Sequence, residues 1–533
     1  MKYKKYFFSF VLVFLNFNFY SQNSSQIELP EVTTIISAET LTVDEKSLPD
    51  FSNLLEISEN SGSVTIKLPK ISESENNEIN FEEKNTEKTI FVEGTVLGGF
   101  PNLFLNEFSI FNQKLNSPMK IHLFYENNGK YGFHSLNDAF FDTNAIFDFE
   151  KKIVNKNFSW NFSGSYKFLE NGLQNLTENI HSTNQNDVFC KIDFLSNLPY
   201  ENHLGFNLFF QNYTRYSNLT NSANFEEWIK KTNYFSFSPD IFYFWEKNNF
   251  YLKFDAKYDF EFFEKIYSRG QADLNFSWKN DFINIFSNVG FIAGTNINSN
   301  FVIPFSVGSS FLIPVNFSNR KIDFSFEGGL FSEKTTPSDY EEKYKFSAFS
   351  KMPSENSNWY GKINFILPIK NEFSINLNAI YKQTYLQNGN WIPTYEKSPL
   401  LNGFYGYEQK NQKIFTSSLG FSYFYKIFSF SANWKSNWLE IPVLENAQEL
   451  NLKFSVIDEN DKWGSEFSCD FVFIGDEKTP LISLNGFFKV KDSIKLVLET
   501  EDLINLFSGK TRKFAGEYHS NGGTASFGVK FNF

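Results

Sequence analysis

The sequence contains very few cysteines and no excess of basic residues, and each absence excludes a class of protein. Only Cys190 and Cys469 occur among the 533 residues, so neither a disulfide framework nor a cysteine-based metal site can be built. We expect two unpaired thiols, with one long-range disulfide as the alternative. The formal net charge of −12 argues against a nucleic-acid partner, because such binding needs basic patches.

Motifs for catalysis or cofactor binding are also missing. The sequence has no phosphate-binding loop, dinucleotide-binding fingerprint or nucleophile elbow. The five histidines show no metal-ligand spacing, so we expect neither a metal nor a cofactor. His519 lies beside Glu517 and Ser520, but nothing else orients it for catalysis. We therefore expect that the protein is not an enzyme.

Long apolar runs are absent after the first 20 residues, and no helical period is sustained anywhere. The start of the chain is the exception, because three lysines precede an apolar stretch over 6–19. This pattern is typical of a signal peptide, so we interpret 1–22 as an export signal, with an anchor helix as the alternative. Residues 23–88 are predicted to form a flexible periplasmic segment, since the stretch 71–89, which reaches the start of the predicted barrel, is acidic and poor in apolar residues.

Aromatic residues, in contrast, are abundant and regularly spaced from about residue 89 onward. They make up 19% of the chain, including 69 Phe. In 250–263 apolar residues occupy every second position and charged residues lie between them, and 157–168, 373–381 and 493–499 repeat the pattern. A biased base composition can raise the number of Phe, but it cannot place Phe at alternate positions. A period of two predicts strands with one apolar and one polar face.

The length of these strands indicates the architecture. Strands of soluble sandwiches usually span about 5 to 6 residues, whereas those of transmembrane barrels need about 9 to 11. The runs here are mostly 10 to 14 residues long. Together with the export signal they predict an all-β fold, a large antiparallel transmembrane β-barrel over 89–533.

The number of strands can be predicted because it must be even. The pattern fits 23 segments, including 342–352, but single-chain bacterial barrels have even numbers of strands. Short and long connections alternate consistently when they are followed from either end, and the two alternations conflict by one strand between about 295 and 353. We therefore predict 22 strands, with 20 or 24 as alternatives.

The last part of the sequence resembles the end of the TonB-dependent receptor barrel. Residues 487–514 contain a penultimate strand and a long loop, and TASFGVKFNF (524–533) is a last strand that ends in Phe. The family opens this loop with an Asn-Leu motif, which is partly kept here as Asp502 and Leu503. Residues 27–40 are similar to the stretch that opens the receptor plug.

This resemblance implies an outer-membrane barrel. The family's plug is much longer than the 66 residues of 23–88, so the chain looks like a plugless, spirochaetal-type relative in which this segment is at most a plug remnant. TonB-coupled uptake is then in doubt. The resemblance also implies a signal for the outer-membrane barrel assembly machinery in the last strand. It consists of Phe527, Val529, Phe531 and Phe533.

Two groups of residues are candidates for contact with solutes or ligands. The first is expected to face the lumen, as a solvated wall of mixed sign or as a selective site. Its members are Lys253, Asp255, Lys257, Asp259 and Glu261. The second lies in the long extracellular connection 384–409 and either binds a ligand or packs down to close the barrel mouth. Its members are Trp391, Tyr395, Phe404, Tyr405 and Tyr407.

The preferred hypothesis is a porin-like channel or transporter for small solutes in the outer membrane. Its expected partners are membrane lipid, the barrel assembly machinery and an unidentified solute. The alternative is an occluded, adhesin-like barrel that has a structural role or whose loops bind ligands or host components.

Overall fold

The structure is a computed structural model that describes residues 90–114, 116–129, 139–177, 179–219, 230–297, 300–315, 321–370, 372–385, 388–397, 404–474 and 479–533. All of them belong to one compact unit. The predicted signal peptide, 1–22, and the acidic segment, 23–88, lie outside the described residues. No helix among the described residues is long and apolar enough to cross a membrane.

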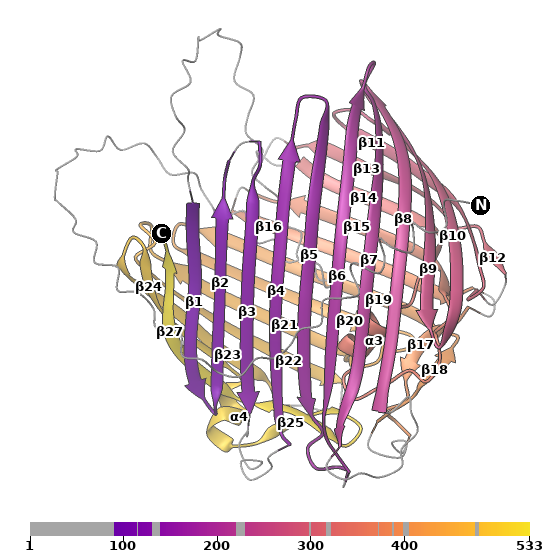
Figure 1. The fold of residues 1–533 in the computed structure, drawn as a ribbon. Coiled ribbons are helices and arrows are strands. Elements are labelled where there is room, and N and C mark those ends of the chain that lie inside the picture. Colours follow the sequence, from indigo (N-terminus) through magenta and orange to yellow (C-terminus); the bar gives the residue numbers. More distant parts are fainter. Residues whose placement is uncertain are drawn as a thin grey trace, which may run out of the picture. The chain divides into compact units, whose positions relative to one another are not determined.

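The described residues form one closed antiparallel β-barrel (Figure 1). Its strands are β1 (Ile90–Phe100), β2 (Leu103–Asn112), β3 (Met119–Gly129), β4 (Phe141–Val154), β5 (Phe158–Gly172), β6 (Ile180–Leu198), β7 (Asn202–Leu219), β8 (Lys231–Lys247), β9 (Phe250–Phe263), β10 (Lys265–Lys279), β11 (Ile283–Gly294), β12 (Phe301–Val302), β13 (Phe305–Pro314), β14 (Lys321–Glu333), β15 (Asn356–Pro368), β16 (Phe373–Thr384), β19 (Lys413–Tyr425), β20 (Phe428–Asn437), β21 (Gln448–Ile457), β22 (Trp463–Ile474), β23 (Leu481–Lys491), β24 (Ile494–Glu501) and β27 (Thr524–Asn532).

β12 and β13 count as one barrel strand. Both pair with β11 in the same register, Ile292 opposite Val302 and Val289 opposite Phe305. Pro304 lies at the break between them, where it cannot donate a backbone hydrogen bond. The barrel therefore has 22 strands, and the predicted fold class and strand number are confirmed.

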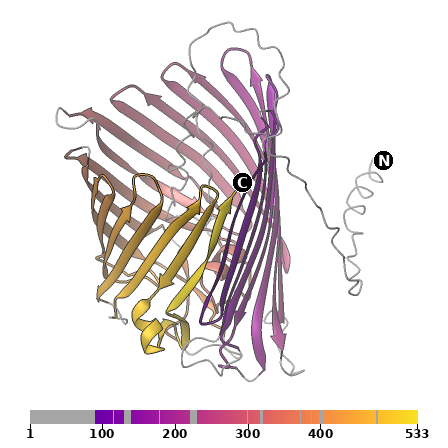
Figure 2. The same cartoon turned by 90° about the vertical axis from the view of Figure 1, so that its left-hand side faces the viewer.

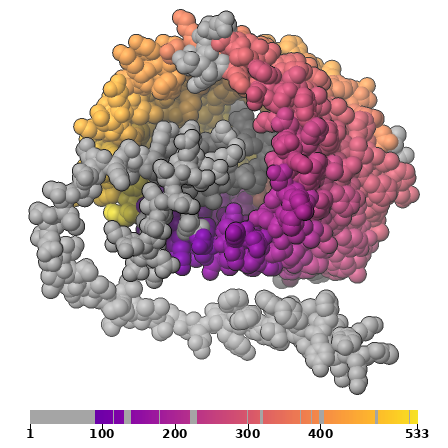
Figure 3. All heavy atoms as spheres, turned by 90° about the horizontal axis from the view of Figure 1, so that it is seen from above, coloured from indigo at the N-terminus to yellow at the C-terminus, as the bar shows by residue number. Residues whose placement is uncertain are grey.

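Each strand has an apolar outer face and a polar inner face. On β9, Phe250, Phe254 and Tyr258 are 45 to 50% exposed on the outside, whereas Asp259 and Glu261 are buried on the inside. The alternation in the sequence thus corresponds to the two sides of the wall, as in transmembrane barrels. Viewed along its axis, the wall surrounds a hollow interior (Figure 3).

The two rims of the barrel differ in the length of their connections. At the rim where β1 begins and β27 ends, the connections have no more than six residues, and we call this the short-turn rim. The opposite, long-loop rim carries the connections 334–355, 385–412 and 502–523. These contain α3 (Pro337–Lys343), β17 (Asn390–Pro393), β18 (Tyr407–Lys410), α4 (Leu503–Ser508), β25 (Thr511–Ala515) and β26 (Tyr518–Gly522) (Figures 1 and 2).

The strand predicted at 342–352 is wrong. This segment contains the end of α3 and an irregular stretch in which Phe346 has a positive φ of 63°. Tyr344, Phe346 and Ala348 are buried in a packed core, but Ser347 and Phe349 are buried as well, so the alternation does not mark the two faces of a strand. The error lies inside the window that the parity of the connections had identified, and removing it reduces 23 segments to 22.

The barrel closes where β27 pairs with β1, from Glu93 opposite Asn532 to Phe100 opposite Ala525. Gly528 lies at the centre of this seam, and a β-carbon there would collide with the carbonyl oxygen of Val96. We expect Gly528→Ala to destabilise the barrel by about 1 to 3 kcal/mol, because the backbone must move apart. Gly98→Ala is the matched control, since no atom lies within 4 Å of its added carbon. Urea unfolding, followed by heat-modifiable gel migration, measures both variants, and equal stability would contradict the prediction.

The last residue also contributes to this seam. The backbone of Phe533 exchanges two hydrogen bonds with Val92, of 2.7 and 2.8 Å, and its side chain is 66% exposed on the outer face. We expect deletion of Phe533 to reduce the amount of assembled barrel in the membrane, because the seam loses this pair and the outer face loses its terminal aromatic residue. The heat-modifiable fraction in membranes is the measurement, and normal insertion would contradict the prediction. Phe533→Leu keeps the backbone pair and separates the two contributions.

Candidate functional site: a cap of loops in the barrel mouth

The described residues of the three long connections fold inward at the long-loop rim, and we call them the cap: 334–355, 385, 388–397, 404–412 and 502–523. They are joined to one another through Tyr405. Its backbone exchanges hydrogen bonds of 2.9 and 3.0 Å with Phe346 and Ala348, and its hydroxyl accepts a bond of 3.1 Å from the backbone N–H of Glu517. The cap is therefore one packed structure.

A fully buried ion pair fixes α3 to the inner face of β7. The Nε atom of Arg215 lies 2.8 Å from Oε2 of Glu341, and both side chains are 0% exposed. The same carboxylate accepts hydrogen bonds from the Tyr213 hydroxyl, at 2.7 Å, and from the backbone N–H of Phe349, at 2.9 Å. The Arg215 guanidinium also lies over the ring of Phe404, 5.6 Å from its centroid. This anchor holds two of the three cap connections.

A second ionic network fixes both ends of 334–355. Lys334 lies 3.0 Å from Glu261 and 3.4 Å from Asp259. Arg269 donates to both oxygens of Glu355, at 2.9 and 3.0 Å, and also to Asp259, at 3.1 Å. All three carboxylates are almost completely buried. Buried charges of this kind are costly unless they are paired, so each end of the segment is held in place.

The predicted lumen-facing residues thus fall into two groups. Asp259 and Glu261 are buried and hold the cap. Lys253, Asp255 and Lys257 remain partly exposed on the inner face of β9. Lys253 pairs with Asp255 at 3.0 Å and Lys257 with Asp259 at 3.4 Å, so most of these charges are compensated.

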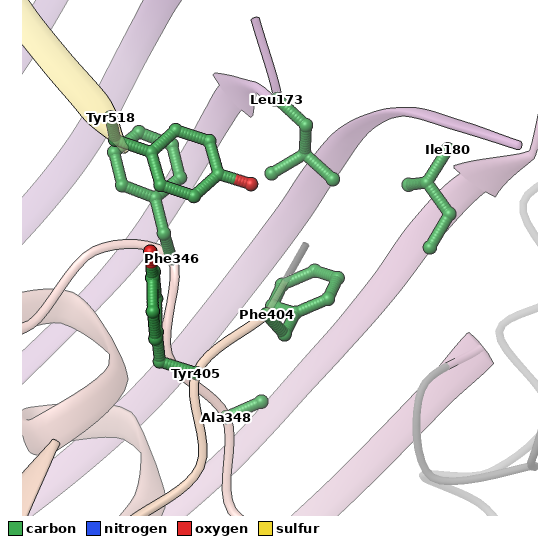
Figure 4. Packing of buried hydrophobic residues seen from close by; sticks show 7 residues of the cluster. All are labelled: Leu173, Ile180, Phe346, Ala348, Phe404, Tyr405 and Tyr518. Carbon is green, nitrogen blue, oxygen red and sulfur yellow. The ribbon is translucent and has the colours of Figure 1, made fainter. Parts of the chain in front are cut away.

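Aromatic packing fills the space between the connections. The rings of Phe346 and Tyr518 stack with centroids 3.8 Å apart, as do those of Phe349 and Tyr407. Figure 4 shows the first of these stacks together with the surrounding side chains of one buried cluster. The cluster consists of Leu173, Ile180, Phe346, Ala348, Phe404, Tyr405 and Tyr518.

The five predicted loop aromatics all lie in this packing. Trp391, Phe404 and Tyr405 are at most 7% exposed. The indole N–H of Trp391 donates to the carbonyl of Ser354 at 2.8 Å, and the hydroxyl of Tyr395 to that of Lys345 at 2.6 Å. Tyr407 stacks on Phe349. The structure thus buries the aromatic side chains of this connection against other residues of the cap.

Burial extends the pH range over which the cap phenols are neutral. Desolvation raises the pKa of Tyr395, Tyr407 and Tyr518 above the ordinary value of 10. An ordinary phenol is already protonated at physiological pH, and these hydroxyls stay protonated in alkaline solution as well. The donor in the hydrogen bond from Tyr395 to Lys345 is not lost by titration.

Asp502, which replaces the Asn of the family motif, has a structural role. It adopts a left-handed conformation with φ 49°, caps α4 and is 3% exposed. Its two oxygens accept from Nε and Nη2 of Arg512, at 2.6 and 2.9 Å. An Asn side chain suits this backbone conformation equally well, but it would leave Arg512 without a carboxylate.

A cavity of about 320 Å³ lies in the inner wall below the cap, between β9 and β15. Ser332 in its lining donates to Glu355 at 2.8 Å, so the cavity borders the anchor of the cap.

In the described ranges no group of three or more His, Cys, Asp or Glu side chains is arranged to hold a metal ion. Both cysteines are free. His519 contacts Thr511 at 3.2 Å.

The sequence matches no protein-family model and none of the curated proteins, but solved structures share its fold. The FrpB iron transporter from Neisseria meningitidis superposes with a TM-score of 0.62 at 9% identity, covering 84% of this chain and 83% of that one. The copper transporter OprC gives 0.60 at 10% identity, with 84% and 81% covered. The siderophore receptor PirA from Acinetobacter baumannii gives 0.61 at 9% identity, with 83% and 80% covered. The chain therefore has the barrel fold of the TonB-dependent receptors.

Proposed function

We propose that this protein is an outer-membrane barrel that carries a small solute and performs no catalysis. The apolar outer face and the polar inner face support a position in a membrane. The fold is shared with transporters of iron and copper and with a siderophore receptor, and this similarity supports transport. In such a membrane the long-loop rim faces outward and the short-turn rim faces the periplasm.

The cap is the observation that carries this proposal. A barrel with loops that pack together at its long-loop rim and are tied to the inner wall by a few buried ion pairs has the parts of a gated passage. The burial of Trp391, Phe404 and Tyr405 removes aromatic surface on which the adhesin-like alternative depends. An occluded mouth is common to both hypotheses, so the preference for transport rests on this burial and on the fold shared with transporters.

We also propose that the barrel works without a full plug. The cap supports this proposal, because loops packed at the long-loop rim give the barrel an occluding element of its own. Coupling to an energised partner is then unnecessary, and the solute passes when the cap opens.

Planar-bilayer recording of the refolded protein tests the proposal. We expect brief conductance steps in a protein that shows heat-modifiable migration, because a closed cap opens only transiently. A folded barrel that stays silent, even when 335–354 are replaced by a short turn, would overturn transport. Specific binding of a surface ligand by that silent barrel would support the adhesin-like alternative.

A further inference from the structure

The cavity below the cap has an uncompensated negative charge. Asp255 and Asp273 face each other as cross-strand partners on β9 and β10, and both line the cavity. Like charges directly opposite each other destabilise a sheet. The other inward-facing acidic residues of this strand pair, Asp259 and Glu261, are paired with Arg269 and Lys334. Among the inward-facing acidic residues of β9 and β10, Asp255 and Asp273 are therefore the pair that lies opposite a like charge.

Asp273 is the carboxylate without a counter-charge. Asp255 has Lys253 at 3.0 Å, but the described residues provide no ion pair for Asp273, which is only 8% exposed. Its Oδ2 accepts a hydrogen bond of 2.5 Å from the amide of Gln271. The oxygen of that amide accepts from Arg269 at 2.7 Å, which orients the amide toward Asp273. The carboxylate is thus held in position before any ligand arrives.

The remaining lining has mixed polarity. Asn275, Asn288 and Ser306 provide neutral hydrogen-bonding groups, whereas Pro304 and Phe331 provide apolar surface. The lining contains no lysine or arginine. A volume of about 320 Å³ is at the lower end of the range for small-molecule sites.

We propose that this cavity binds a small organic cation, with its ammonium or guanidinium group between Asp255 and Asp273 and its apolar part against Pro304 and Phe331. The cation would supply the counter-charge that Asp273 lacks, beside an Asp255 that already pairs with Lys253. The assignment of this cation as the transported solute rests on the proposed function, but the binding itself does not.

Two variants test the site by independent means. Asp273→Asn removes the charge and keeps the shape. Gly290→Ala keeps the charge, but its added carbon would meet Oδ1 of Asp273 and displace the carboxylate. Glu466→Gln is the control, because Glu466 lies on β22 and pairs with Lys453, outside the cavity. Heat-modifiable migration shows that each variant is folded.

The measurement is calorimetric titration of the folded barrel in detergent at low salt with benzylamine, benzyl alcohol and Ca²⁺. We expect benzylamine to bind, and Asp273→Asn to weaken its affinity about tenfold to a hundredfold, as expected for loss of a hydrogen bond to a charged group. Gly290→Ala should also weaken it, and Glu466→Gln should not. Equal binding of benzyl alcohol, binding of Ca²⁺ alone, or unchanged affinity in Asp273→Asn would overturn the site. A barrel that conducts but does not bind benzylamine refutes this inference only, and one that binds but never conducts refutes only the transport.

Discussion

Replacing residues 335–354 by a four-residue turn should convert the capped barrel into an open pore. The replacement is sterically simple because Glu333 and Asn356, at the ends of β14 and β15, are already cross-strand partners. It removes α3 and one side of both aromatic stacks. Barrels of 16 to 18 strands already leave an aqueous channel, so a barrel of about 22 strands without this segment should conduct several-fold more than the intact protein. Single-channel recording in planar bilayers measures the change.

The control is an external connection of similar position that takes no part in the cap. Residues 438–447 join β20 to β21, and Trp438 and Leu439 are more than half exposed. Replacing 439–446 by the same turn should leave the conductance unchanged. If both replacements have the same effect, or neither has any, the segment 334–355 is not what closes the barrel.

The Arg215→Ala variant should loosen the cap without removing it. Glu341 would remain buried without its counter-charge, and breaking a buried pair in this way costs about 3 to 5 kcal/mol. The hydrogen bond from the Phe349 amide to Glu341 reports the opening directly. Its hydrogen exchange should become faster by about two to four orders of magnitude if local opening limits exchange. Mass spectrometry of the peptides covering 338–352 measures this rate.

Two further variants separate charge from packing. Combining Arg215→Met with Glu341→Gln removes both charges and keeps an amide oxygen that can accept from the Phe349 N–H, so exchange should return toward the rate of the intact protein. Lys397→Ala breaks an exposed pair with Glu408, which is worth about 0 to 1 kcal/mol, and should have little effect. Fast exchange in the Met/Gln variant would mean that the ion pair as such is needed.

The sequence predicted the strands of the barrel wall far better than the loops that form the cap. A period of two reports that a strand has two different faces, and this is sufficient for β9 or β27. It does not report what the apolar face contacts. Phe346 and Ala348 contact other cap residues, and the Ser347 between them is buried as well, whereas the same pattern elsewhere places its apolar residues against lipid. Only the parity of the connections could distinguish the two cases.

The anchors of the cap were missed because their partners are distant in the sequence. Asp259 and Glu261 could be placed on an inner face, but nothing in a local pattern pairs them with Lys334. One signal was available. The chain has only four arginines, and the three among the described residues, Arg215, Arg269 and Arg512, all form ion pairs in the cap. In a chain that otherwise uses lysine, the planar five-donor side chain is retained where carboxylates are buried.

The complete burial of Arg215 and Glu341 determines how their ion pair responds to the salt concentration of the medium. Dissolved ions weaken attractions between charges that water can reach, and they have much less effect on a pair that is shielded from it. A cell surface meets both dilute and saline media. A closure held by surface charges would loosen as salinity rises, whereas this one should keep the same strength in fresh water and in brine.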